Sequence, residues 1–309
     1  MDSLVARSKP ARAPLDFERM ELSPGIVQRW LVPALSIAIL GGAVLQLRNL
    51  DFHRLIAMTP VSPLFWAVFL VSYFFQPASE WVIFHRLWDL PKRAILPLLR
   101  KRLTNEVLLG YSGEVYFYTW ARRNAAMVTA PFGAVKDVAI LSAAVANVVT
   151  LVLVAACWPL LNGIKLGFDG EMITGSAAII TVGSLATMLF RRFLFSLGTR
   201  DLLFIAGVHL VRIIANLALT AALWAMIMPS APLSWWLLLV TLRMLVSRLP
   251  LIPNKDLVFA GLAAFMIGRE TDTTALVSLI AGLTLAAHLA VGAGLGALDL
   301  AGASEEAKA

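Results

Sequence analysis

Residues 135–161 read VKDVAILSAAVANVVTLVLVAACWPLL, and after Asp137 this stretch contains no charged residue. A helix needs about 20 mostly apolar residues to cross the hydrocarbon core of a bilayer. The stretch is long enough, and its few polar residues do not form a water-facing side. It therefore predicts a membrane-spanning helix.

Similar apolar windows recur along the chain and predict an all-α bundle of about seven spans. The other windows lie roughly at residues 30–47, 63–84, 173–190, 202–228, 231–249 and 273–298. The composition agrees, because 59% of the 309 residues are hydrophobic and 15% are charged, whereas soluble domains contain about 25% charged residues. We expect a polar cytosolic leader at residues 1–28, one transmembrane domain at 29–299 and a polar tail at 300–309.

The basic residues gather beside the apolar windows. The net charge is +7, which also occurs in nucleic-acid-binding proteins, but clusters in this position are typical of charges that orient membrane helices. We therefore expect no nucleic acid partner. Lysine and arginine favour the cytoplasmic side, and their alternation predicts a cytoplasmic N-terminus. The leader lacks the apolar core of a signal peptide, so we expect it to be retained.

Two stretches interrupt the pattern of spans. Residues 92–123 read KRAILPLLRKRLTNEVLLGYSGEVYFYTWARR, with a basic amphipathic beginning that is typical of interfacial helices. Residues 243–269 read RMLVSRLPLIPNKDLVFAGLAAFMIGR, in which Pro250 and Pro253 exclude one continuous helix. We expect each stretch to be a re-entrant pair of half-helices, which a membrane tolerates where protein or water covers the backbone.

The two interruptions also resemble each other weakly. In each, a Leu-Arg pair is followed by a polar break, an acidic residue and a short apolar segment. The acidic residues are Glu114 and Asp256, and VYFYTWA and LVFAGLA follow them. Repeated broken helices indicate the binding site in many transporters. The chain is therefore a candidate for a weak inverted repeat, although apolar segments also resemble one another by chance.

Charged residues in apolar surroundings are the candidate site, because burying a charge in a membrane is costly and indicates a function or a partner. Glu80 is one such residue. The candidate substrate-binding residues are Glu106, Glu114, Asp137, Arg212, Arg243, Arg248, Lys255 and Asp256. The excess of cations over acids near the breaks favours an anionic head group, since the planar guanidinium group suits phosphate. One alternative is that the long side chain of Arg212 extends so that its charged group reaches the membrane interface. Another is that the basic residues only set topology.

No catalytic or cofactor motif is apparent. His53, His85, His209 and His288 lie apart, without a second ligand four residues on. No phosphate-binding loop, dinucleotide fingerprint or nucleophile elbow occurs. Cys157 has no cysteine to pair with and is expected to be a packing residue. We therefore expect no bound metal, no cofactor and no enzyme activity.

Four segments carry a family resemblance: WVIFHRLWDL at 81–90, LLGYSGEVYFYTWARR at 108–123, APFGAVKDVAILSA at 130–143 and LPLIPNKDLVFAG at 249–261. Together they resemble the transmembrane domain of lysylphosphatidylglycerol synthases, which also occurs alone as a flippase-like family. Gly113-Glu114 and Lys136-Asp137 stand where the family has its Gly-Glu break and the acidic start of the next span. Tyr111-Ser112 and Asn254-Lys255 depart from the proline- and glycine-containing turns of the family.

The resemblance implies that lipids are translocated between leaflets, with two re-entrant regions facing a central cavity. The soluble aminoacyl-transferring domain of the synthases has no counterpart here, so lipid lysylation is not expected. The leading hypothesis is a lipid flippase of the bacterial inner membrane, with membrane lipids as partners. The alternatives are a membrane-embedded lipid-modifying transferase and a non-transporting assembly or regulatory subunit. A homo-oligomer or a membrane partner protein is compatible with each.

Overall fold

The computed structural model describes residues 59–107, 112–124, 131–163, 195–248, 259 and 272–306. Within these ranges the regular structure consists of seven α-helices and one short 3-10 helix, with no strand. The predicted all-α helical bundle is therefore confirmed.

Four of the described helices are long and apolar enough to cross a membrane. They are α4 (Pro63–Trp88), α7 (Pro131–Gly163), α10 (Thr199–Ile227) and α13 (Asp272–Glu306). Each coincides with a span window of the sequence, so the chain is a helical membrane protein. The helix α13 continues to Glu306, beyond the predicted start of the tail at residue 300.

The structure describes fewer residues of the remaining windows. The windows at 30–47 and 173–190 lie outside the described residues, as does the leader. The window at 231–249 contains α11 (Leu233–Ser247), whose 15 residues are fewer than a span requires. The proline at position 232, which lacks a backbone N–H, precedes the first turn and sets the beginning of this helix.

The first interruption forms separate short helices instead of one span. After the 3-10 helix η3 (Lys92–Ala94), α5 (Ile95–Val107) and α6 (Ser112–Asn124) each contain 13 residues. At 1.5 Å per residue such a helix is about 20 Å long, shorter than the ~30 Å hydrocarbon core. The two helices pack against each other, and we call them the hairpin.

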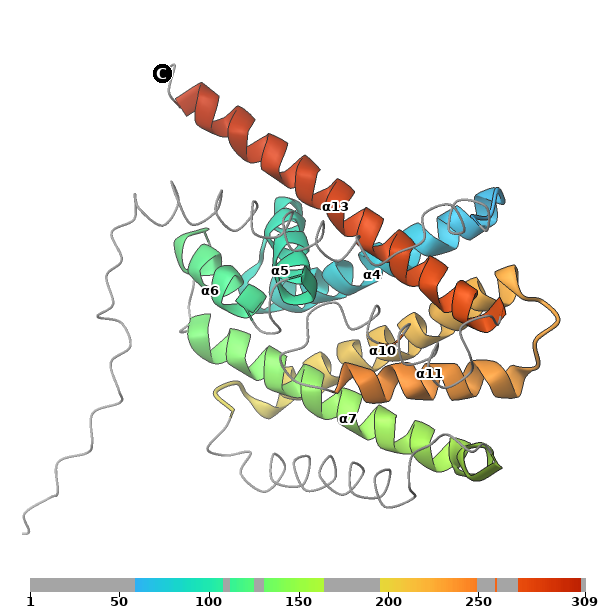
Figure 1. Cartoon of the computed structure of the whole chain (residues 1–309). Coiled ribbons are helices and arrows are strands. Elements are labelled where there is room, and N and C mark those ends of the chain that lie inside the picture. Colours follow the sequence, from blue (N-terminus) through green and yellow to red (C-terminus); the bar gives the residue numbers. More distant parts are fainter. Residues whose placement is uncertain are drawn as a thin grey trace, which may run out of the picture.

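The helix α10 lies in the middle of the bundle and contacts α4, α7, α11 and α13 (Figure 1). The hairpin packs through α5 against α4 and α13, and through α6 against α7. The helix α4 ends at Trp88, which is followed by the left-handed residue Asp89. This arrangement brings α4, the hairpin, α7 and α10 around one region.

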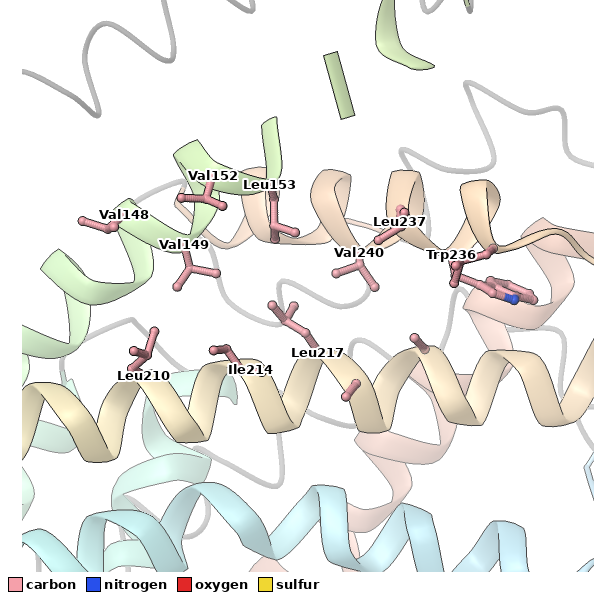
Figure 2. Close-up of a pocket in the computed structure, with 13 residues that line it drawn as sticks. Val148, Val149, Val152, Leu153, Leu210, Ile214, Leu217, Trp236, Leu237 and Val240 are labelled. Atoms are coloured by element: carbon pink, nitrogen blue, oxygen red, sulfur yellow. The ribbon is translucent and has the colours of Figure 1, made fainter. Parts of the chain in front are cut away.

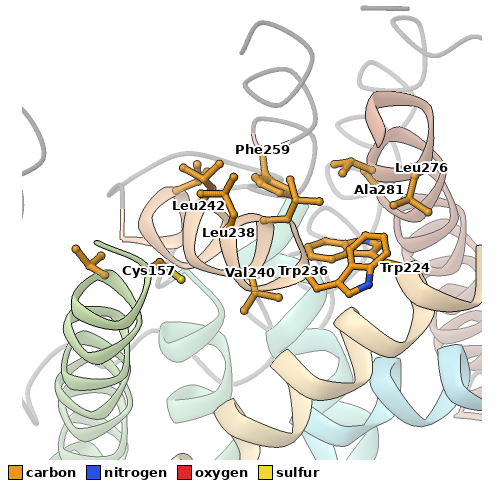
Figure 3. Packing of buried hydrophobic residues seen from close by; sticks show 13 residues of the cluster. Cys157, Trp224, Trp236, Leu238, Val240, Leu242, Phe259, Leu276 and Ala281 are labelled. Atoms are coloured by element: carbon orange, nitrogen blue, oxygen red, sulfur yellow. The ribbon is translucent and has the colours of Figure 1, made fainter. Parts of the chain in front are cut away.

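Two main apolar clusters fill the described part of the bundle. Near the C-terminal end of α10, Trp224 packs against Trp236 of α11 and against Phe259, as Figure 3 shows. The Cys157 thiol lies in this cluster, 3.1 Å from the hydroxyl of Thr241, which confirms it as a packing residue. The other cluster joins α4, the hairpin, α7 and the beginning of α10.

Candidate functional site

A buried ion pair joins α4 to the hairpin. The Lys101 Nζ atom donates a hydrogen bond of 2.7 Å to Glu80 Oε2. The side chains of Lys101 and Glu80 are only 4% and 8% exposed. Desolvating two charges is costly, and a buried pair is maintained only where the attraction and hydrogen bonding between its partners offset that cost.

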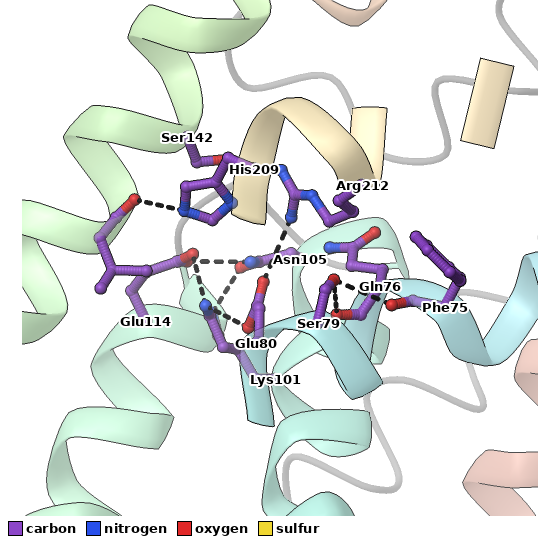
Figure 4. Close-up of polar contacts among 12 residues, drawn as sticks. Phe75, Gln76, Ser79, Glu80, Lys101, Asn105, Glu114, Ser142, His209 and Arg212 are labelled. Atoms are coloured by element: carbon purple, nitrogen blue, oxygen red, sulfur yellow. Dashed lines mark hydrogen bonds and ion pairs between the residues drawn. The ribbon is translucent and has the colours of Figure 1, made fainter. Parts of the chain in front are cut away.

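The ion pair continues at both ends. Glu114 Oε1 of α6 lies 3.4 Å from Lys101 Nζ, and the Arg212 guanidinium group of α10 lies 3.6 Å from Glu80 Oε1. The four residues form a row in which positive and negative charges alternate, in the order Arg212, Glu80, Lys101, Glu114. We call it the charge chain (Figure 4). Two of its members belong to spans and two to the hairpin.

Neutral groups orient both ends of the charge chain. The Asn105 amide donates a 2.9 Å hydrogen bond to Glu114 Oε2, while its carbonyl oxygen accepts the Gly113 N–H at 2.7 Å. At the other end, Arg212 donates to the Ser142 hydroxyl of α7 at 2.8 Å. The site therefore draws on α4, both helices of the hairpin, α7 and α10.

Gly113 allows the two helices of the hairpin to approach closely. A Cβ atom at this position would overlap the backbone carbonyl of Lys101, and it would lie 2.8 Å from the Asn105 side chain. Only a residue without a side chain fits there. The close approach brings Glu114, the next residue, within reach of Lys101.

His209 borders the charge chain from α10, one turn before Arg212. Its Nε2 atom lies 3.2 Å from the backbone carbonyl of Val138. Since a carbonyl oxygen only accepts, Nε2 carries the proton and Nδ1 is a lone-pair acceptor. Nδ1 is buried and has no hydrogen-bond partner among the described residues.

Electrostatics keep the hairpin lysine charged. Lys101 lies outside the four spans, and its burial lowers the pKa of the ammonium group. The adjacent carboxylates of Glu80 and Glu114 act in the opposite direction and more strongly together, so that the pKa is raised above its ordinary value. The ammonium group therefore remains protonated, which preserves the alternation of charges.

The hairpin also forms polar contacts with α13. Arg100 pairs with Asp299 and donates to the Leu295 carbonyl. The Tyr73 hydroxyl of α4 lies 2.9 Å from His288 Nδ1 of α13. The Arg100 contacts hold α5 against α13, and the contact of Tyr73 with His288 joins α13 to α4.

The structure brings two of the candidate residues from the sequence together, because Glu114 and Arg212 are the two ends of the charge chain. Asp137 lies elsewhere: it is fully buried, and it accepts the backbone N–H groups of Ser196 and Leu197 at 2.6 and 2.8 Å. It thereby ties the beginning of α7 to the segment before α10.

The other candidates are not members of the charge chain or lie beyond the described ranges. Glu106 lies on α5 and Arg243 on α11. Arg248 follows α11 and donates to the Asn147 side chain of α7 at 3.4 Å. Lys255 and Asp256, and with them most of the second interruption, lie outside the described residues.

Sequence reasoning missed Lys101 and Asn105. Lys101 stands in a run of three basic residues, Arg100 to Arg102, and such a run is typical of the charges that set topology. A usable signal was the spacing of Lys101 and Asn105, because residues four apart lie on the same face of a helix. A cation and an amide on one face, opposite an acidic residue in the next helix, indicate a polar contact inside the hairpin.

An apolar groove lies on the opposite face of α10. It has a volume of about 450 Å³, and every residue that lines it is hydrophobic. The helices α7 and α11 form one side and α10 the other, as Figure 2 shows for Val152, Leu237 and Ile214. The groove contains no group that could bind a polar head group or take part in catalysis.

Within the described ranges, no three histidine, cysteine, aspartate or glutamate side chains gather as metal ligands. Comparison with known proteins adds no assignment: no family model matches the chain, and no curated protein or solved structure is significantly similar to it.

Proposed function

We propose that the chain is a lipid-transport protein that moves phosphate-bearing lipids between the leaflets of a membrane. The observation that carries this proposal is the charge chain, four ionised side chains inside a bundle of membrane-spanning helices. Charged residues in this position are costly and are typical of pathways for polar substrates.

The division of the charge chain between two structural units supports transport rather than a static role. Glu80 and Arg212 stand on spans, while Lys101 and Glu114 stand on a hairpin that is too short to cross. Short helices that enter a membrane and turn back commonly line the substrate site of transporters. A movement of the hairpin relative to α4 and α10 would separate the ion pairs and open the polar region to a head group.

Arg212 is the group we propose to bind the phosphate. Its guanidinium group has five N–H donors, and among the described residues it makes one hydrogen bond, to Ser142. Its ion pair with Glu80 is long, at 3.6 Å. Donors therefore remain for the paired hydrogen bonds that arginine forms with phosphate. The acyl chains of the lipid would stay in the bilayer while the head group crosses.

The cellular setting is part of the proposal. The flippase-like resemblance of the sequence favours a bacterial inner membrane, and the basic leader favours a cytoplasmic N-terminus. No nucleotide-binding motif occurs in the sequence, so uphill movement would require an ion gradient or a partner protein.

Reconstitution into vesicles tests the proposal. Lipids labelled on an acyl chain, with native head groups, are added in trace amounts, and a membrane-impermeant reductant bleaches the label in the outer leaflet. We expect complete bleaching with the protein and about half in protein-free vesicles. Arg212→Gln should slow the movement about tenfold or more, the effect of losing one charged hydrogen bond.

The matched control is Arg123→Gln, which removes an exposed arginine at the end of α6. It should move lipid at the wild-type rate. Wild-type protein that cannot be distinguished from empty vesicles, across phosphate-bearing lipids of several classes, would refute lipid transport. The lipid-modifying transferase or the assembly subunit would then be the better hypothesis, and recovery of a stable stoichiometric partner would favour the subunit.

A further inference from the structure

The two ends of the charge chain have opposite charges and are more exposed than the two residues between them. The side chains of Glu114 and Arg212 are 19% and 11% exposed, whereas those of Glu80 and Lys101, between them, are 8% and 4% exposed. A ligand that reaches this region therefore meets one carboxylate and one guanidinium group, with a neutralised pair behind them.

The charges of the site also balance. The charge chain contains two acids and two bases, and so it has no net charge. Two further charges, Arg102 and Glu106 of α5, lie near Tyr73 and again have opposite signs. In surroundings of low dielectric constant, an anion would gain from Arg212 but would be repelled by the adjacent Glu80 carboxylate. Among the described residues, the cation excess apparent from the sequence does not extend to this site.

We propose that the lipid head group bound here is zwitterionic, with a phosphate and an ammonium group. The phosphate would pair with Arg212 and the ammonium group with Glu114, so that each end of the chain meets its opposite charge and the site remains neutral. This inference rests on the proposed function and names the class of lipid transported. It replaces the anionic head group expected from the sequence.

The hydrogen-bonding capacity of Arg212 and Glu114 is compatible with a zwitterionic head group. Arg212 retains N–H donors beyond its bond to Ser142. Glu114 accepts one hydrogen bond, from Asn105, and its other oxygen lies 3.4 Å from Lys101. A carboxylate has about four acceptor sites, so Glu114 can accept the N–H groups of a primary ammonium without releasing these partners.

Head-group selectivity tests the inference in the same vesicles, composed of equal amounts of phosphatidylethanolamine and phosphatidylglycerol. Acyl-labelled forms of each lipid are compared in trace amounts. We expect wild-type protein to move phosphatidylethanolamine at least about tenfold faster, which corresponds to about 1.4 kcal/mol. Equal rates, or faster phosphatidylglycerol, would overturn the inference and leave lipid transport standing. No movement of either lipid would refute the proposed function itself.

Charge variants provide the second arm. Glu114→Gln leaves the site with one excess positive charge and should shift the ratio of rates towards phosphatidylglycerol by about tenfold. Arg212→Gln leaves an excess negative charge and should favour a labelled lipid with an ammonium group and no phosphate. Asp89→Asn, an exposed carboxylate after α4, and Arg123→Gln should leave the ratio unchanged. A ratio that does not move in either site variant would overturn the inference, and should one variant fail to fold, the other and the wild-type ratio decide.

Discussion

The two faces of α10 place the same helix in two different environments. One face carries His209 and Arg212, and it meets α4 and α7 through hydrogen bonds and an ion pair. The opposite face carries Leu210, Ile214 and Leu217, and it lines a groove without polar groups. A single helix thus separates a region that depends on paired charges from a region that depends on apolar contact.

The difference lies in what each face requires from the rest of the chain. An apolar side chain in a bilayer is solvated by hydrocarbon whether or not another helix covers it, so the groove tolerates an open side. A buried charge has no such substitute and needs a specific partner at a specific distance. Substitutions on the charged side should therefore have large effects, and substitutions on the groove side small ones.

The largest effect is expected at Lys101. Lys101→Met should lower the free energy of unfolding by about 3–5 kcal/mol, because it leaves the Glu80 carboxylate buried beside a single, more distant cation. Thermal unfolding of the purified protein in detergent measures the change. Lys92→Met, at an exposed position of η3, should leave the melting temperature nearly unchanged.

A double variant separates the charge from the packing. Glu80→Gln added to Lys101→Met removes the unpaired charge and should recover part of the lost stability. Two results would contradict the ion pair. One is a melting temperature of Lys101→Met equal to that of the wild type. The other is a double variant whose loss of stability equals the sum of the losses in the two single variants.

The next effect is expected at Gly113. Gly113→Ala should lower stability by about 1–3 kcal/mol, since its methyl group overlaps the Lys101 carbonyl and must push α6 away from α5. The matched control is Gly207→Ala in α10, where an added Cβ atom has open space around it and should raise stability slightly through helix propensity. Melting temperatures that change equally in both variants would contradict the close approach within the hairpin.

Much of the fold could be predicted from the sequence, because the length of an apolar run is enough to predict a membrane span. An uninterrupted apolar run such as 138–161 has no alternative solvent, and the window at 202–228 matches α10 to within a few residues. The limits of α11 were less predictable. Its window includes Arg243 and ends near prolines, so local breaks rather than apolar length determine where the helix stops.

The candidate site was predictable in part. The sequence indicates Glu114 and Arg212 individually, because each is a charged residue in apolar surroundings. The pairing of α4 with the hairpin and with α10 depends on tertiary packing, which one sequence does not specify. Lys101 was not predictable for a further reason. A lysine between two arginines gives the same sequence pattern whether its side chain faces water or a buried carboxylate.

A smaller effect is expected at Asp137, which lies near the beginning of α7. Asp137→Asn keeps an oxygen acceptor for the N–H groups of Ser196 and Leu197 but removes its charge. Since charged hydrogen bonds are about twice as strong as neutral ones, we expect a loss of about 1 kcal/mol. Thermal unfolding again measures it. The same substitution should leave the ratio of lipid rates unchanged, and a shift in that ratio would instead make Asp137 part of the lipid site.

The smallest effect is expected in the groove, where two adjacent isoleucines of α10 provide an internal comparison. Ile213 is 8% exposed and packs with Ala146 and Met244, whereas Ile214 is 54% exposed and lines the groove. Ile213→Val removes a buried methylene and should cost about 0.5–1.5 kcal/mol. Ile214→Val should change the melting temperature hardly at all, because detergent or lipid hydrocarbon takes the place of the missing methylene. Equal losses at the two positions would mean that the groove is covered by protein, and the contrast between the two faces of α10 would then be one of polarity alone.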